Sequence, residues 1–241
     1  MTPRNRCNLL RFGSILFLDA QKRQMNEFGW PYIGPCVKDC ENKIATTCEA
    51  IVTGETISYY AWVIEMMVEM EPRWLLSSLK LIFADNFITD QLLSLLGINE
   101  TCTLRCDHYH LINEVWPTAT SFGETILAKV KNNLLQMLTG RTKKIWDNAY
   151  STACNILKTN PRKKKKLEDI YNRPTYYSGY HLMSIEGNRG HRGSTPAEIN
   201  HASIVAYFGK GNNWSIMEQI NELMKRHQNH EKIRERDKQR L

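Results

Sequence analysis

Residues 14–19 read SILFLD, a short apolar run that ends at Asp19. Such a run predicts a buried β-strand, because a strand covered on both faces carries apolar side chains in succession. Pro31–Val37 and Ile44–Thr53 follow; both are rich in β-branched and aromatic residues and are bounded by turns with glycine, proline or asparagine. Short connections between successive strands predict an antiparallel meander.

The periodicity changes at Thr56, where apolar residues begin to recur every three or four positions. The stripe consists of Tyr59, Trp62, Val63, Met66, Met67 and Met70. This spacing predicts a helix whose stripe faces the core and which ends at Pro72.

A second buried strand is predicted over Leu79–Ala84, directly before Asp85. A helical stripe follows, made of Ile88, Leu92, Leu95 and Leu96. Gly97 is expected to close that helix, Thr101–Cys106 to form another strand, and a further helix to start near Tyr109. A meander that leads into crossover helices implies an α/β fold with a mixed sheet flanked by helices.

The second half of the chain is predicted to be mostly helical. Helical periodicity recurs over Ile126–Leu138 and Trp146–Leu157, and the basic run Pro161–Lys166 is expected to be a solvated loop. Helices are expected over Thr195–Phe208 and from Ile216 to Leu241; the last one is charged, and its part from Lys225 onward is expected to be solvated. The expected organisation is an N-terminal extension (1–13), a first part of the core (14–119), a helical insertion with the basic loop (120–190), a final core helix region (191–215) and a charged C-terminal helix or tail (216–241).

The composition favours a protein that binds a polyanion and argues against secreted and membrane-spanning proteins. The 241 residues carry 32 Lys+Arg and 25 Asp+Glu, a formal charge of +7, which favours a polyanionic partner such as nucleic acid or an acidic membrane face. Seven cysteines without a C-x-x-C pair argue against a secreted disulfide framework. No apolar run approaches the ~18–20 residues of a membrane-spanning helix, and the N-terminus lacks the apolar core of a secretory signal.

Three acidic residues stand at the ends of predicted elements: Asp19, Asp85 and Glu198. If the two aspartate-bearing strands are neighbours, the carboxylates converge, and a helix packed across the strand ends can add the third. Hard oxygen ligands of this kind suit Mg²⁺ or Mn²⁺, and two such ions support phosphodiester chemistry. Structural roles stay open, because an aspartate after a strand also serves as a turn residue, and Thr195–Glu198 reads as a helix capping box.

Five segments in this order are similar to motifs of one known family. They are Asp19–Asn26, Glu55–Trp62, Leu81–Asp85, Arg105–Asn113 and Ser194–His201. They resemble, respectively, the first acidic motif, the Glu-Ser/Thr…Trp helix, the second acidic strand, the Cys/His segment and the Glu-x-Asn motif of Mutator-like element transposases. The likeness covers about residues 14–208.

The resemblance implies a ribonuclease-H-like fold with an α-helical insertion before the last catalytic helix. In that fold the first acid lies on the first strand, the second at the end of the fourth and the third on a later helix. Asp19, Asp85 and Glu198 would then be the catalytic residues and the ligands of Mg²⁺ or Mn²⁺. The implied reaction is DNA strand cleavage and transfer in transposition, in the nucleus, with transposon ends and target DNA as partners and a homo-oligomer as the active form.

Other residues are assigned roles that the resemblance leaves open. Cys106, His108 and His110 depart from the family's Cys-x-x-His spacing and are expected to bind zinc or to be structural. The expected nucleic-acid contacts are Arg162, Lys163, Lys164, Lys165, Lys166 and His201, and the basic run also fits a nuclear-import signal or a merely solvated segment.

Only 18 residues precede Asp19, too few for a zinc-binding module that recognises transposon ends. A truncated or decayed copy is therefore expected. The alternative functions are a non-catalytic DNA-binding protein derived from a transposase, or a ribonuclease-H-like nuclease that acts on RNA–DNA hybrids.

Overall fold

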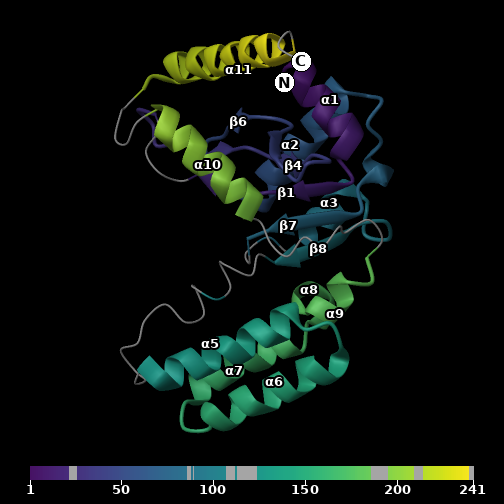
Figure 1. Ribbon diagram of the computed structural model, residues 1–241, viewed down its shortest axis with the longest axis vertical. Helices are drawn as coiled ribbons and strands as arrows, with labels where there is room; N and C mark the ends of the chain where they lie inside the picture. Colours follow the sequence, from purple (N-terminus) through teal and green to yellow (C-terminus); the bar gives the residue numbers. More distant parts are fainter. Residues whose placement is uncertain are drawn as a thin grey trace.

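The computed structural model of this chain describes residues 1–21, 26–85, 88, 90–106, 112, 124–185, 195–208 and 214–238. The backbone alone is described for a few helical residues, whose side chains are left out: 124, 195, 197, 198, 230, 231 and 233–238. Figure 1 shows an α/β core, with strands in its centre, and a helical bundle below it. The predicted α/β class with a mixed sheet is confirmed.

The described residues form a five-stranded sheet in the order β5-β4-β1-β7-β8. Its strands are β1 (Ile15–Phe17), β4 (Cys36–Lys38), β5 (Ile44–Thr46), β7 (Leu81–Ala84) and β8 (Thr103–Cys106). β4 pairs antiparallel with β1 and β5, whereas β1–β7 and β7–β8 are parallel. The meander of β1, β4 and β5 is therefore confirmed, and the parallel pairs follow from the crossover connections.

A second, smaller sheet was not predicted. It consists of β2 (Ala20–Gln21), β3 (Tyr32–Ile33) and β6 (Ala50–Ile51), in the antiparallel order β2-β3-β6. Two segments predicted as single strands are thus divided between the two sheets: Pro31–Val37 contains β3 and β4, and Ile44–Thr53 contains β5 and β6. Proline lacks a backbone N–H and interrupts a ladder, and Pro35 sits between β3 and β4. The carbonyl of Pro35 accepts both the N–H and the hydroxyl of Thr47. These two hydrogen bonds fix the chain at the break between β5 and β6.

The helix predicted after Thr56 is α2 (Ile57–Met70), but its buried face differs from the predicted stripe. Trp62 is 44% exposed and Met70 is 40% exposed, whereas Tyr60 and Ile64, outside the stripe, are fully buried. Most side chains around α2 are apolar, so several stripes fit the spacing equally well. The sheet surface on which the helix packs decides which one is buried.

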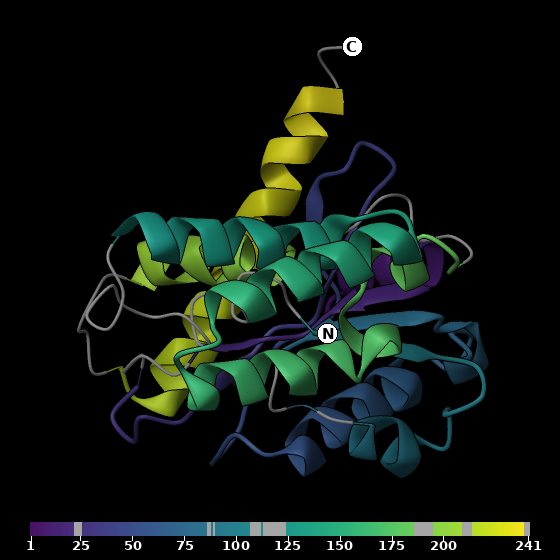
Figure 2. The ribbon, with the colours of Figure 1, turned by 90° about the horizontal axis from the view of Figure 1, so that it is seen from below.

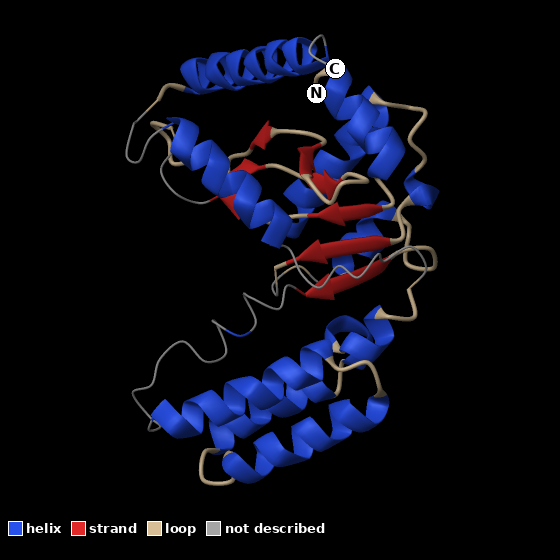
Figure 3. Cartoon of the chain, in the orientation of Figure 1, coloured by secondary structure: helices blue, strands red, loops and turns tan. Residues whose placement is uncertain are grey.

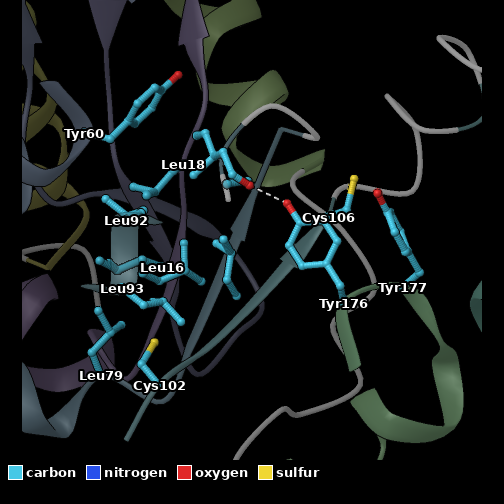
Figure 4. Close-up of a cluster of buried hydrophobic side chains, with 14 of the residues drawn as sticks. Leu16, Leu18, Tyr60, Leu79, Leu92, Leu93, Cys102, Cys106, Tyr176 and Tyr177 are labelled. Atoms are coloured by element: carbon cyan, nitrogen blue, oxygen red, sulfur yellow. Dashed lines mark hydrogen bonds between the residues drawn. The ribbon is translucent and has the colours of Figure 1, made fainter. Parts of the chain in front are cut away.

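The next helix, α3 (Gln91–Leu96), ends as predicted at Gly97. Gly97 has φ 66°, a left-handed conformation that glycine adopts without steric cost. The buried stripe again differs, since Leu93 is buried and Leu95 is 47% exposed. Figure 4 shows Leu92 and Leu93 against Leu16 and the strands of the main sheet.

The N-terminal extension contains α1 (Pro3–Phe12), which was not predicted. Its sequence signal is short but clear: Thr2 is the N-cap and accepts the N–H of Asn5, and Pro3 takes the first helical position. Leu9 is the fully buried apolar contact of this helix with the core.

The helical bundle lies between β8 and the late helices in the chain. It comprises α5 (Glu124–Thr139), α6 (Lys143–Ile156), α7 (Pro161–Tyr171), α8 (Pro174–Tyr177) and α9 (Gly179–Leu182). In Figure 2 the teal and green helices of the bundle run side by side in front of the sheet. Trp146 is buried in its centre and stacks on Tyr171 with ring centroids 5.9 Å apart.

One residue of the sheet joins the bundle to the core. Arg105 of β8 is fully buried and donates hydrogen bonds to the carbonyls of Thr175, at 2.5 Å, and Ser178, at 2.6 Å. Tyr176 adds a hydrogen bond to the carbonyl of Ile88 at 2.5 Å, drawn in Figure 4. The bundle is therefore attached through α8; in Figure 3 the short helices at the top of the bundle lie below the lowest strand of the sheet, on the side where that strand begins.

The basic run predicted as a loop is helical, which corrects that prediction. Residues 161–166 form the first turns of α7, with Pro161 at the first position and Asn160 as the N-cap that accepts the N–H of Lys163 at 3.1 Å. Leu167 and Ile170 bury the inner face of this helix. The cap and the apolar face outweigh the mutual repulsion of the basic side chains.

Replacing Asn160 with alanine is expected to lower the free energy of unfolding by about 1 kcal/mol, the usual cost of losing an N-cap. Urea denaturation followed by circular dichroism measures the change. Asn160→Asp is the matched control, because aspartate also caps helices and its charge opposes the cluster of lysines. Equal stability of Asn160→Ala and wild type would show that the cap does not hold α7.

The last helices are α10 (Thr195–Phe208), as predicted, and α11 (Ile216–Lys238). The solvated helix expected from Lys225 onward is wrong at Arg226, and the part of α11 before Lys225 also packs on the fold. Gln219 is fully buried, and Leu223 and Arg226 are each 7% exposed. The Nδ2 of Asn26 donates to the Oε1 of Gln219 at 3.1 Å, so α11 docks against the N-terminal part of the fold.

Glu49 is the centre of a buried polar network beneath α11. Its carboxylate accepts the hydroxyl of Tyr32 at 2.9 Å and lies 3.6 Å from the guanidinium of Arg226. His227 contacts the other carboxylate oxygen. This network ties α11 to β3, because buried polar groups are stable only when they are paired.

Candidate active site

Asp19 and Asp85 lie at the ends of neighbouring parallel strands. The register of β1 with β7 pairs Phe17 with Phe83, and the N–H of Leu18 donates to the carbonyl of Phe83 at 2.8 Å. Asp19 comes two residues after Phe17 and Asp85 two residues after Phe83, so the two aspartates would lie level if this register continued beyond the strands. The condition for the predicted convergence of the carboxylates, that the two strands are neighbours, is therefore met, while the convergence and the catalytic role stay predictions.

Both carboxylates are largely withdrawn from solvent, with Asp19 7% and Asp85 8% exposed. The Oδ1 of Asp19 accepts the N–H of Ala20 at 2.8 Å, and its Oδ2 lies 3.1 Å from the Nδ1 of His201. Burying a carboxylate costs free energy unless hydrogen bonds or opposite charges compensate. Asp19 has such compensation from a backbone N–H and from a helix distant in sequence.

His201 brings α10 to this strand end. The ring is 3% exposed and packs edge-on against Tyr32, with centroids 5.7 Å apart and planes at 78°. Its Nε2 is buried without a hydrogen-bond partner among the described residues. His201 was predicted to contact nucleic acid; that role stays a prediction, and the observed contact is with Asp19.

Glu198, the predicted third acid, belongs to α10 and precedes His201 by three residues. Residues three apart are neighbours on one side of a helix, so its backbone position is one turn from the contact with Asp19. Its side chain lies outside the described residues, as does that of Thr195, so neither metal binding nor the capping box is tested. Among the described side chains, no group of three His, Cys, Asp or Glu residues is arranged to hold a metal.

Tyr60 of α2 lies near both aspartates. Burial raises the pKa of the Tyr60 hydroxyl, and the negative charges of Asp19 and then Asp85 raise it further. The hydroxyl donates to the Oε1 of Glu55 at 3.0 Å. The segment that holds this pair had been matched to a family motif, but its closeness to the acids was not predicted. Only the packing of α2 on the sheet reveals it.

Cys36 also faces the first acid from the neighbouring strand β4. Burial is the main cause that raises the pKa of its thiol, and the charge of Asp19 adds to it. The Cys36 thiol is thus protonated at neutral pH and behaves as a small apolar group. Cys40 is exposed, so these two cysteines form no joint site.

Cys106 ends β8, where the register pairs it with Ala84, the residue before Asp85. It is fully buried. His108 and His110, its predicted partners in a zinc or structural site, lie outside the described residues, so that site stays a prediction.

The basic run occupies the start of α7 on the surface of the bundle. Arg162, Lys165 and Lys166 are exposed, and Lys163 and Lys164 are half-buried. Burial lowers the pKa of Lys163, and the positive charges of Lys166 and Arg162 lower it further. Five consecutive cations thus surround the start of α7, where Lys164 lies 3.7 Å from Glu168, and a nearby polyanion would reduce their mutual repulsion.

Comparison with known proteins gives no relative: no family model and no curated protein matches this chain. No helix in the described part of the chain is long and apolar enough to cross a membrane.

Proposed function

We propose that this chain is the catalytic domain of a Mutator-like element transposase, which cuts and joins DNA strands. The observation that carries the proposal is the pair of buried aspartates, Asp19 and Asp85, each of which follows one of two adjacent parallel strands. The contact between His201 and Asp19 places α10, from the second half of the chain, beside the same strand end.

The order of elements supports a ribonuclease-H-like fold with a helical insertion. Among the strands of the main sheet, β1 comes first in the chain and β7 fourth. Asp19 lies two residues after the first strand, where the resemblance implies a position on the strand, and Asp85 comes directly after the fourth strand, at the end that the resemblance implies. The α5–α9 bundle lies between β8 and α10 in the chain, where an insertion before the last catalytic helix is expected.

The carboxylate oxygens of the three acids are the kind of donor that binds a divalent cation. A carboxylate offers about four lone-pair positions, and the N–H of Ala20 and the ring of His201 use only part of those on Asp19. Asp19, Asp85 and Glu198 would hold Mg²⁺ or Mn²⁺. When bound, such ions activate a water or hydroxyl and stabilise the leaving oxygen of a phosphodiester.

The surrounding side chains orient the acids and exclude water. His201 and the N–H of Ala20 fix the carboxylate of Asp19 from two sides, while Tyr60 closes the site from α2. The lysines of α7 would contact DNA phosphates, and binding of that kind weakens as salt rises.

His201 is proposed as a positioning residue, so His201→Ala is expected to lower the nicking rate by about ten- to a hundredfold. The same variant should need more Mg²⁺ for half-maximal activity, which a purely structural role would not require. His201→Asn should restore part of the rate, because its amide can donate to Asp19. His181→Gln, a change in the bundle, is the control. An unchanged Mg²⁺ dependence in His201→Ala would contradict the assignment.

The test of the proposed function is nicking of supercoiled plasmid DNA by the full chain with Mg²⁺ or Mn²⁺, compared with the same reaction in excess chelator. An RNA–DNA hybrid added as competitor separates a transposase from a nuclease of the alternative class. Absence of metal-dependent nicking would favour the non-catalytic alternative.

A further inference from the structure

A cavity of about 400 Å³ lies between the start of α1, strand β6 and α11. In Figure 1, α11 crosses above β6 on the side of the core away from the bundle, and the N-terminus lies on that same side. The volume falls in the range of about 300–1,000 Å³ that is typical of small-molecule sites. Most of the lining is apolar: Met1, Trp30, Ile51, Ile216, Ile220, Leu223 and Met224.

The apolar lining favours a ligand with an apolar body. Ile220 is 38% exposed and Met224 is 56% exposed, so part of this lining is in contact with solvent. A ligand that covers these side chains removes apolar surface from water, which stabilises the complex. Trp30 is half-buried in the same lining, and its indole offers a flat partner to an aromatic ring.

The charges around the cavity favour an uncharged ligand. Glu49 and His227 are the titratable side chains among the described residues that line it, and they contact each other. Glu49 also accepts the hydroxyl of Tyr32 at 2.9 Å and lies 3.6 Å from the guanidinium of Arg226. The carboxylate is therefore already compensated, partly by residues outside the lining, and leaves no charge that selects a cation.

Two polar side chains of the lining keep unused hydrogen-bonding capacity. The Nε2 of His227 contacts Glu49, and the Oδ1 of Asn5 accepts the hydroxyl of Thr2. The other side-chain nitrogens, Nδ1 of His227 and Nδ2 of Asn5, make no hydrogen bond with the described residues, and neither atom is fully buried. The amide donates, whereas the imidazole Nδ1 accepts when the ring is neutral and donates when it is protonated. A hydroxyl group, which both donates and accepts, fits these two partners.

We propose that this cavity binds a small uncharged molecule with an aromatic body and a hydroxyl group, that is, a phenol. The apolar lining holds the body, and His227 and Asn5 bind the hydroxyl. The proposal does not depend on the transposase function, because neither Asp19 nor Asp85 lines the cavity.

Binding of 2-naphthol to the full chain, measured by isothermal titration calorimetry, tests the proposal. Naphthalene has the same body without the hydroxyl, and 2-naphthoate has a charged carboxylate in its place. Wild type should bind 2-naphthol about tenfold more tightly than either, because only the hydroxyl is both uncharged and able to form the hydrogen bonds. A wild type that does not bind 2-naphthol, or that binds naphthalene or 2-naphthoate equally tightly, would overturn the proposal.

A matched pair of variants on α11 locates the site. Met224→Asp puts a charge into the apolar lining and should weaken the binding of 2-naphthol at least about tenfold. Met217→Asp makes the same change on the same helix, outside the lining, and should bind like wild type. Both methionines are more than half exposed, at 56% and 64%, so both variants are expected to fold. Equal affinities of the two variants would place the ligand elsewhere and contradict the proposal.

His227→Phe tests the polar contact, because phenylalanine keeps a ring and removes Nδ1. The folded variant should bind naphthalene like wild type but lose most of its preference for 2-naphthol. An unchanged preference would refute the role of His227. If this variant does not fold, as judged by circular dichroism, the comparison of the three ligands and the methionine pair still decide the proposal.

Discussion

Replacing Asp19 or Asp85 with asparagine is expected to lower metal-dependent DNA nicking by about a thousandfold or more. Asparagine keeps the shape of the side chain but removes the negative charge that would hold a divalent cation. Metal ions contribute several kcal/mol to phosphodiester cleavage, and each 1.36 kcal/mol corresponds to about a tenfold change in rate. Initial nicking rates at saturating Mg²⁺, with plasmid in excess, measure the loss.

Asp169→Asn provides the matched control, because it makes the same chemical change at an exposed position of α7. Its nicking rate should equal that of wild type. All three variants are compared by circular dichroism and urea denaturation, so that a loss of rate is separated from a loss of fold. Folded Asp19→Asn or Asp85→Asn that nicks DNA at the wild-type rate would refute the proposed function.

Replacing Arg105 with alanine is expected to cost about 3 kcal/mol of unfolding free energy. Hydrogen bonds that involve a charged group contribute about 1.5–3 kcal/mol each, and the guanidinium makes two of them. Burial lowers the pKa of Arg105 to about 10, so the side chain is still charged at neutral pH. The alanine variant no longer has to bury a charged group, and this offsets part of the loss. The expected cost therefore lies at the lower end of the combined value of the two hydrogen bonds.

Urea denaturation measures this cost, and hydrogen exchange shows where it falls. Exchange should accelerate first in α8 and α9, because Arg105 binds the carbonyls of Thr175 and Ser178 there. Arg141→Ala, at an exposed position between α5 and α6, should change the stability by less than about 0.5 kcal/mol. A stability of Arg105→Ala within that range would show that other contacts join the bundle to the core.

The sequence predicts elements better than it predicts their faces. Short apolar runs before Asp19 and Asp85 identify the two central strands, and the spacing of apolar residues identifies α2, α5, α6 and α10. The buried side of α2 could not be predicted, because its apolar residues surround the helix. The division of the early strands between two sheets was missed because it depends on breaks at Pro35 and around Thr47.

In the candidate site, too, the sequence predicts the elements but not how they pack against one another. Two similar apolar runs predict that Asp19 and Asp85 each follow a strand, but the pairing of those two strands is seen only in the structure. Tyr60 beside both acids, and His201 against Asp19, depend on how α2 and α10 pack, which no local pattern encodes. The helix at the basic run was missed although Asn160 and Pro161 form a recognisable start signal, because its charge density suggested a loop.

Asp19 follows the first strand of the main sheet, yet its support comes from residues far along the sequence. His201 contacts it, Tyr32 packs against His201, and Glu49 binds Tyr32 together with Arg226. Contacts between residues this far apart in sequence form slowly, because a long loop must close first. During folding, therefore, the first acid acquires its full surroundings only after α10 and α11 have packed against the strands of the N-terminal half.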